Sequence, residues 1–441
     1  MAGIFKAYDI RGIYGKTLDD SIAEKIGRAI PTFLGCKKVV VGRDMRPHSE
    51  PLFAALAKGL TAQGADVIDL GLCSTPMSYY ANETLGADAS VMITASHNPG
   101  EWNGFKICRA SAIPLSGKTG IADIERIVAE GSFAAPAATP GRIVPHDIGP
   151  AYAAHIASFA DLRRPLRVLL DFGNAMGIAE ARSFDGLPLE ITRLYDTLDG
   201  TFPNHEANPL QTSTLADAQA AVRAGHFDFA AAFDGDADRA GFIDEKGDIV
   251  PMDMITALIA KTLLAKNPGA HIFYDLRSSW AVKEVIEECG GIPHQSRVGH
   301  AFIKEQMRSV DAIFAGELSG HYYFKANSFA ESSSLAVLLV ANLLSQSDKP
   351  LSELIRPIKR YFASGEINSS VADAPAVLAR LRKRYADASI LELDGLSFEY
   401  PTWWFNVRCS NTEPLVRLNL EAKTPEEMAA RRDEVLSLIR Q

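Results

Sequence analysis

Three aspartates at alternate positions follow a short apolar segment near the middle of the chain. They are Asp234, Asp236 and Asp238, separated by the small residues Gly235 and Ala237. Carboxylates with this spacing can converge on a hard divalent cation when the backbone curls around it, and the small residues leave room for that curl. The segment therefore favours a divalent-metal site.

Two other interpretations of this segment are open. Together with Glu245, the aspartates fit positions 1, 3, 5 and 12 of an EF-hand calcium loop. Position 6 of that loop, where the sharp turn needs glycine, is Arg239, and the preceding Phe227–Phe233 is typical of a strand rather than of an entering helix. The other alternative is a solvated acidic turn.

A serine that leaves an apolar segment is the second candidate for chemistry. Ser96 follows Val91–Thr94 and precedes His97, Asn98 and Pro99. An exposed hydroxyl at the end of a buried strand can act as a nucleophile or carry a phosphoryl group. The alternative is a turn serine that bonds its own backbone.

A carboxylate and a hydroxyl two residues apart form the third candidate. Glu317 and Ser319 lie between Gly316 and Gly320, and His321 follows. The carboxylate can accept two hydrogen bonds from neighbouring sugar hydroxyls, the glycines allow close backbone approach, and the histidine can move a proton. A helix N-terminus or a plain polar loop is the alternative.

The fourth candidate is a polar loop between two arginines. Arg408 precedes Ser410, Asn411 and Thr412, and Arg417 follows them. Two guanidinium groups beside a loop rich in donors suit a phosphate dianion; a hairpin with solvent-facing arginines is the alternative. Taken together, the four patterns propose a serine carrier, a divalent metal, a polyol site and a phosphate site, which is the set needed for phosphoryl transfer on a phosphosugar.

Short apolar runs that end in polar residues must position these groups. Such runs predict buried strands, among them Val39–Val41, Val91–Thr94, Val168–Leu170, Phe229–Phe233, Ile272–Tyr274 and Ala312–Ala315. Helical spacing in Asp253–Lys266 and Trp280–Cys289 predicts helices between strands, and hence α/β units that bind ligands at the carboxyl ends of their strands.

We expect three similar α/β domains with mixed, largely parallel sheets, and a C-terminal α+β domain. Segments rich in proline or glycine mark the boundaries. The predicted domains are I (1–148) with the serine loop, II (149–247) with the metal loop, III (248–362) with the sugar loop and IV (363–441) with the phosphate loop. In domain IV we expect antiparallel strands from Ile390 to Ala422 and a helix over Pro425–Arg440.

The composition excludes several classes of protein. The 441 residues are 47% hydrophobic and 22% charged, with a net charge of −9, which argues against broad nucleic-acid binding because that needs a basic surface. The five cysteines form no CxxC pair, and the longest apolar stretch, Leu335–Leu344, is short for a membrane span. We expect a cytoplasmic protein without a signal peptide, a membrane anchor or an obligatory protein partner.

These motifs resemble the phosphomannomutase/phosphoglucomutase branch of the α-D-phosphohexomutase family. All four occur in family order, and Tyr8–Gly12 is similar to the family's N-terminal signature. The resemblance implies four domains around a central cleft, a phosphorylated Ser96, and Mg²⁺ held by the three aspartates and a phosphoserine oxygen. It implies transfer-site roles for Arg11, His97, Lys106 and Arg239, sugar contacts by Glu317 and Ser319, a substrate contact by His300, and phosphate contacts by Arg408, Ser410, Asn411, Thr412 and Arg417.

The resemblance also implies a reaction. Phosphoserine donates its phosphoryl group to a hexose monophosphate, and the resulting hexose 1,6-bisphosphate turns over in the cleft and also serves as an activator. Lys106 or His321 is the expected proton acceptor, whereas Arg277 has no assigned role. Asn411 and Leu318 favour mannose and glucose substrates over glucosamine; a phosphosugar-binding protein without catalysis and a calcium-loop interaction protein are the alternatives from other classes.

Overall fold

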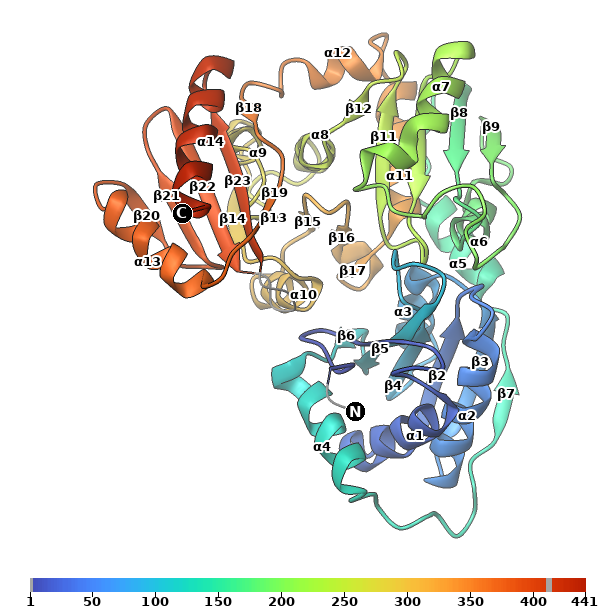
Figure 1. The fold of residues 1–441 in the computed structure, drawn as a ribbon. Coiled ribbons are helices and arrows are strands. Elements are labelled where there is room, and N and C mark those ends of the chain that lie inside the picture. Colours follow the sequence, from blue (N-terminus) through green and yellow to red (C-terminus); the bar gives the residue numbers. More distant parts are fainter. Residues whose placement is uncertain (1–2, 410–414) are drawn as a thin grey trace.

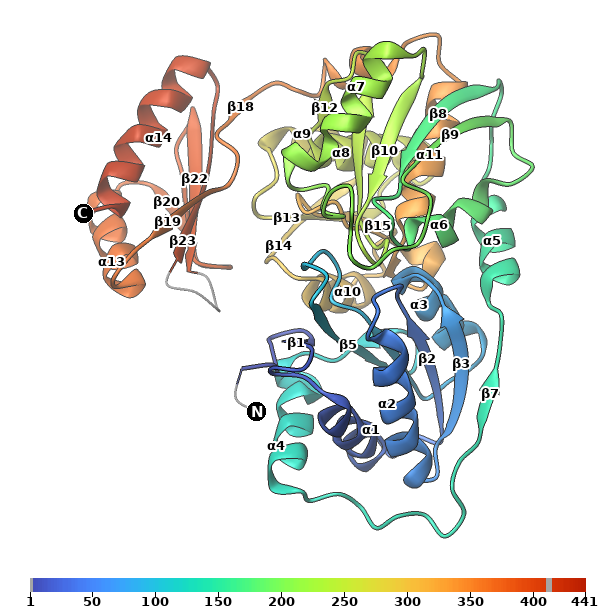
Figure 2. The same ribbon diagram turned by 45° about the vertical axis from the view of Figure 1, so that its right-hand side comes forward.

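The chain folds into four domains, each built on its own β-sheet (Figures 1 and 2). The structure is a computed structural model that describes residues 3–409 and 415–441. It confirms the predicted fold class of three similar α/β domains followed by an α+β domain.

Domain I carries a seven-stranded sheet in the order β1-β5-β4-β2-β3-β7, with β6 paired to β5. Its helix α1 begins where the Asp19 side chain accepts a hydrogen bond from the Ile22 amide, which is typical of an N-cap. The elements are β1 (Ile10–Ile13), α1 (Asp20–Leu34), β2 (Lys38–Arg43), α2 (Ser49–Ala62), β3 (Asp66–Leu72), α3 (Thr75–Thr84), β4 (Ala89–Ile93), β5 (Trp102–Arg109), β6 (Ile113–Pro114), α4 (Ala122–Glu130) and β7 (Ile143–Pro145).

Domains II and III each have a five-stranded sheet, in the orders β12-β11-β10-β8-β9 and β14-β13-β15-β16-β17. Domain II contains α5 (Gly149–Ala157), β8 (Leu166–Asp171), α6 (Gly177–Glu180), β9 (Leu189–Leu194), α7 (Ala216–Ala224), β10 (Phe229–Phe233), β11 (Ala240–Asp244) and β12 (Ile249–Val250). Domain III contains α8 (Met252–Leu264), β13 (His271–Asp275), α9 (Trp280–Glu288), β14 (Ile292–Ser296), α10 (His300–Ser309), β15 (Phe314–Gly316), β16 (Tyr322–Phe324), β17 (Ala330–Glu331), α11 (Ser333–Ser345) and α12 (Leu351–Ile355).

Domain IV is an antiparallel sheet in the order β18-β23-β22-β21-β20, with β19 also paired to β23. Helices α13 and α14 cover its outer face (Figure 2). The elements are β18 (Phe362–Ala363), β19 (Ile367–Ser370), α13 (Ala374–Arg384), β20 (Ser389–Leu391), β21 (Leu396–Glu399), β22 (Trp403–Cys409), β23 (Leu415–Ala422) and α14 (Pro425–Ile439).

One arrangement of four strands is repeated in the first three domains. The runs β3-β2-β4-β5, β9-β8-β10-β11 and β14-β13-β15-β16 each contain three parallel strands followed by an antiparallel one. The loop between the third and fourth strands holds Ser96 in domain I, the three aspartates in domain II and Glu317 in domain III. The three predicted loops therefore occupy equivalent places, at the carboxyl end of a parallel strand.

Hydrophobic cores divide the chain differently from the sheets. A single core cluster joins domains II and III and reaches α3 of domain I, whereas domains I and IV also have separate cores. Domains II and III therefore share one hydrophobic core, while domain IV folds around its own core. Over the residues that the structure describes, none of the helices combines the length and apolarity required to cross a bilayer.

Candidate active site

The serine loop is held by a buried arginine that the sequence did not single out. Ser96 is fully buried and has a positive φ of 53°, a strained conformation for a residue other than glycine. The Arg46 guanidinium donates to the backbone carbonyls of Ser96, Asn98 and Pro99 at 2.9, 2.6 and 2.7 Å. Arg11 adds a 2.6 Å hydrogen bond to the Asn98 side chain. Positively charged donors thus fix the loop around the serine.

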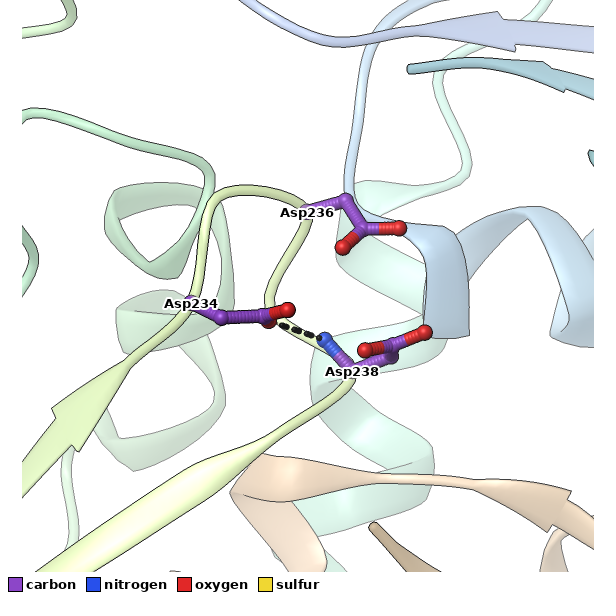
Figure 3. Close-up of side chains that lie close together, drawn as sticks. All are labelled: Asp234, Asp236 and Asp238. Atoms are coloured by element: carbon purple, nitrogen blue, oxygen red, sulfur yellow. Dashed lines mark hydrogen bonds between the residues drawn. The ribbon is translucent and has the colours of Figure 1, made fainter. Parts of the chain in front are cut away.

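The aspartate loop brings three carboxylates together, as Figure 3 shows. One oxygen from each of Asp234, Asp236 and Asp238 lies within 4.8 Å of the others, and all three residues are buried. Oδ1 of Asp236 and Oδ1 of Asp238 make no hydrogen bond among the described residues, although His321 Nε2 lies 3.3 Å from the latter. Buried carboxylates with oxygens that make no hydrogen bond fit a hard divalent cation such as Mg²⁺.

The loop also shows why the two small residues are needed. Ala237 has a φ of 58°, a conformation that favours glycine. At Gly235, a Cβ would lie 2.2 Å from the carbonyl oxygen of Ser96. The absence of a side chain at residue 235 thus lets the loops of domains I and II touch.

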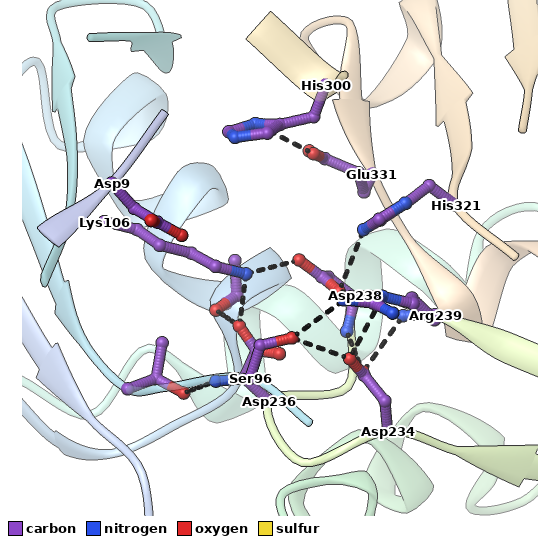
Figure 4. A network of polar contacts seen from close by, with 12 residues as sticks. Asp9, Ser96, Lys106, Asp234, Asp236, Asp238, Arg239, His300, His321 and Glu331 are labelled. Carbon is purple, nitrogen blue, oxygen red and sulfur yellow. Dashed lines mark hydrogen bonds and ion pairs between the residues drawn. The ribbon is translucent and has the colours of Figure 1, made fainter. Parts of the chain in front are cut away.

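Ser96 and the aspartates form one site (Figure 4). The Ser96 hydroxyl donates to Asp234 Oδ2 at 3.1 Å, and Arg239 Nη2 donates to Ser96 Oγ at 3.1 Å. The same Arg239 atom lies 2.7 Å from Nδ1 of His97. The Arg239 cation and burial hold the pKa of His97 well below its usual range, so this imidazole is neutral and its Nδ1 accepts the hydrogen bond.

Lys106 is a second cation in contact with the aspartates. Its ammonium group donates to Asp236 and, at 2.6 Å, to Asp238. Burial opposes the charge, but these two carboxylates raise the pKa of Lys106. Burial and the neighbouring carboxylates raise the pKa of Asp234 to about 8. The residues thus form a cationic and anionic cluster whose charges are shared rather than paired one to one.

His321 connects the metal loop to the sugar loop. Its Nε2 lies 3.3 Å from Asp238 and its Nδ1 lies 3.2 Å from Glu317. Although burial would lower it, the two carboxylates raise the pKa of His321 to about 9. Glu317 Oε1 accepts from the Gly299 amide at 3.1 Å, and its Oε2 accepts from the Tyr323 hydroxyl. His321 and Lys106 both carry a proton at neutral pH, so in this state each can donate a proton rather than accept one.

A buried ion pair behind His300 was missed by sequence reasoning. Glu331 and Lys304 are both fully buried and form an ion pair, and Glu331 Oε1 lies 3.5 Å from His300 Nδ1 (Figure 4). The Lys304 ammonium also lies 3.7 Å from the centre of the Tyr79 ring. Burial and then the charge of Lys304 lower the pKa of His300 well below its usual range. The neutral His300 ring therefore lies with its Nδ1 beside the Glu331 carboxylate.

The arginines of domain IV line a cleft of about 660 Å³ together with Lys6, Tyr8 and Val298. Arg408 and Arg417 face each other across the pair β22–β23. Ser410, Asn411 and Thr412, the predicted phosphate loop, lie outside the described residues. In the sugar loop, the Ser319 hydroxyl oxygen lies 2.8 Å from Nδ1 of His321.

Two charged residues without an assigned role complete the arginine cluster. Arg277 forms a 2.6 Å ion pair with Asp275, and Glu366 contacts Arg408 at 2.8 Å. Asp275 also accepts from the Leu318 amide of the sugar loop at 2.8 Å. No local motif marks Glu366, which contacts Arg408 and Arg417 within domain IV and Arg277 of domain III.

The fold and these contacts place a hydroxyl beside a carboxylate cluster, with a separate arginine cluster across the domain III–IV contact, an arrangement that suits phosphoryl transfer. Family models described as phosphoglucomutase/phosphomannomutase match all four domains: alpha/beta/alpha domains I, II and III at residues 2–135, 150–247 and 251–361, and the C-terminal domain at residues 366–438.

Individual relatives agree with these matches. A phosphomannomutase of Escherichia coli is 40% identical over 99% of both chains, and a protein described as phosphohexose mutases from Xanthomonas campestris is also 40% identical over 99% of both. A solved phosphoglucomutase/phosphomannomutase family protein of Burkholderia thailandensis is 33% identical, covers 99% of this chain and 96% of its own, and superimposes with a TM-score of 0.91.

The chain therefore belongs to the phosphoglucomutase/phosphomannomutase family of α-D-phosphohexomutases. It is a hexose-phosphate mutase, and the expected family resemblance is confirmed.

Proposed function

We propose that the enzyme interconverts hexose 6-phosphate and hexose 1-phosphate, with mannose and also glucose as the sugar, through a phosphorylated Ser96. The observation that carries this proposal is the contact of the Ser96 hydroxyl with Asp234 and Arg239 inside a buried site. The full-length similarity to phosphomannomutases and phosphohexose mutases supports the choice of substrates. Glu317 and Ser319 are assigned to hydroxyls that mannose and glucose share.

We assign a Mg²⁺ ion to Asp234, Asp236 and Asp238, with a phosphate oxygen of phosphorylated Ser96 completing the ligand set. When bound, the ion offsets the negative charge of the transferring group. Arg239 and Arg11 contribute further positive charge, because Arg239 contacts Ser96 Oγ and Arg11 contacts the serine loop. His97 accepts from Arg239 and so orients it.

The bond between Ser96 Oγ and phosphorus breaks, and a bond forms between phosphorus and the free sugar hydroxyl oxygen. The hydroxyl proton leaves the sugar, and Ser96 Oγ regains a proton. We assign proton donation to Ser96 Oγ to Lys106 or His321, which border the carboxylates and hold protons at neutral pH; the group that has given up its proton then takes the proton of the sugar hydroxyl.

The product of the first transfer is a hexose 1,6-bisphosphate, which we also propose as the activator. It must turn over in the cleft so that its second phosphate faces Ser96. Arg408, Arg417 and the segment Ser410–Thr412 bind whichever phosphate is distant from the serine, and His300 contacts the sugar. The separate core of domain IV suits a domain that moves during this reorientation.

We place this reaction in the cytoplasm, with a small phosphosugar as the ligand and with no nucleic acid, membrane or obligatory protein partner. The central test compares the protein with its Ser96→Ala variant in an assay for conversion of mannose 1-phosphate and glucose 1-phosphate, with and without Mg²⁺. We expect turnover to disappear in the variant while calorimetry still detects phosphosugar binding. Intact mass spectrometry after incubation with glucose 1,6-bisphosphate should show one added phosphate on the wild type only; full turnover by the variant would refute the assignment.

A further inference from the structure

One carboxylate lies among three arginines in the domain III–IV contact. The carboxylate of Glu366 is 2.8 Å from Arg408, 3.5 Å from Arg417 and 3.7 Å from Arg277. These arginines come from β22, β23 and the loop after β13, so the cluster joins both domains. Burial opposes ionisation, but the three cations lower the pKa of Glu366. The residue is therefore an internal anion in a site otherwise suited to phosphate.

Among the described residues that form ion pairs within this cluster, carboxylates and guanidinium groups are equal in number. Asp275 pairs with Arg277, and Asp394 lies 3.7 Å from Arg408. Three carboxylates thus face three guanidinium groups. A phosphate dianion that enters such a cluster must take guanidinium donors away from one carboxylate, because each guanidinium has a fixed set of donors.

Glu366 is the carboxylate best suited to give way. Asp275 accepts backbone hydrogen bonds from Arg277 and Leu318, both at 2.8 Å, which hold it in place. Among the described residues, the polar contacts to the Glu366 carboxylate come from side chains, and a quarter of its own side chain is exposed. It follows Gly365, whose φ of 69° marks a turn in the connection between domains III and IV.

We propose that Glu366 is a competing internal anion: it occupies Arg277, Arg408 and Arg417 when phosphate is absent and lowers their affinity for the substrate phosphate. This inference rests on the proposed function and adds a positioning role to it. The reaction needs the distal phosphate to leave the arginines between the two transfers, so the phosphate must not be bound too tightly. Glu366 supplies a replacement anion that stabilises the released state.

The test is the Glu366→Gln variant, which keeps the shape of the side chain and removes its charge. Binding of glucose 1-phosphate is measured by calorimetry in proteins that also carry Ser96→Ala, so that no transfer occurs. We expect the dissociation constant to fall about tenfold, the effect of one partly buried charge on an anion. In the protein with Ser96 intact, we expect KM and kcat both to fall because release becomes slower.

A matched control is Glu399→Gln. Glu399 also connects domains III and IV, through a 3.1 Å hydrogen bond from Trp280 Nε1, but it forms no ion pair with an arginine in residues 3–409 and 415–441. We expect its dissociation constant to stay at the wild-type value. A Glu366→Asp variant, in which the carboxylate is withdrawn by one methylene, should give an intermediate tightening, and circular dichroism checks that each variant is folded.

An unchanged or raised dissociation constant in Glu366→Gln would overturn the proposal, because a carboxylate that only orients the arginines would weaken binding when lost. The calorimetric result does not depend on turnover. If no hexose phosphate is converted by the wild type but the variant still binds glucose 1-phosphate more tightly, the proposed reaction fails while the role of Glu366 stands.

Discussion

A buried glutamate at the junction of three domains should make stability depend on pH. Glu180 of α6 in domain II accepts hydrogen bonds from Ser74 in domain I, from Ser334 in domain III and, at 3.1 Å, from Tyr152. It is fully buried, with no basic residue in ion-pair contact among the described residues. Burial raises the pKa of Glu180 to about 7, even though the hydroxyl donors favour its charged form.

The folded state binds the Glu180 proton more tightly than the unfolded state does, and this decides how stability changes with pH. An unfolded glutamate loses its proton near pH 4.3, whereas folded Glu180 keeps it until about pH 7. Between these values unfolding releases a proton, so a rise in pH favours the unfolded state. The loss of stability is complete above the folded pKa. At about 1.4 kcal/mol per pKa unit, it amounts to roughly 2 to 3 kcal/mol between pH 5 and pH 8.

Glu180→Gln removes this titration because glutamine stays neutral. We expect the variant to be more stable than the wild type at pH 8 by about 3 kcal/mol, with the difference shrinking to below about 1 kcal/mol at pH 5. Denaturant unfolding followed by circular dichroism at several pH values measures the difference. Exposed Glu305→Gln is the control, for which the difference should stay near zero. A Glu180→Gln difference that is constant across this pH range would refute the reasoning.

Two further predictions concern the site itself. Gly235→Ala should lower turnover by at least about tenfold with intact folding, because the new Cβ would lie 2.2 Å from the Ser96 carbonyl oxygen and separate the loops; wild-type kcat would show that this close approach is unnecessary. Glu331→Gln, combined with Lys304→Met, should lower kcat by about tenfold or more, because His300 loses the carboxylate that orients its ring. Lys304→Met is included so that no buried ammonium is left without its partner charge. In a His300→Ala background the Glu331 change should have no further effect on kcat, and additive losses would contradict this coupling.

Local patterns were sufficient for the elements and for the loops. Apolar runs that end in polar residues identified β4, β10 and β15, and the candidate groups of each following loop stood out because they are close together in sequence. The alternative of an EF-hand is wrong, since the aspartates follow a β-strand, β10, rather than a helix. The acidic turn is buried rather than solvated.

The partners of these loops could not be predicted in the same way. Ser96 and Asp234 are 138 positions apart and meet only because domains I and II are packed together. Arg46, Glu331 and Glu366 carry no local signal that separates them from ordinary charged residues, and their contacts are with residues distant in sequence.

The sequence by itself determined which groups are available, because residue type and strand periodicity are local properties. Only the tertiary structure decided which charges face one another, since buried ion pairs depend on the packing of segments that are distant along the chain. The protonation of Lys106 and His321 is the clearest case, because it is set mainly by carboxylates of the domain II metal loop, Asp236 and Asp238 for Lys106 and Asp238 for His321.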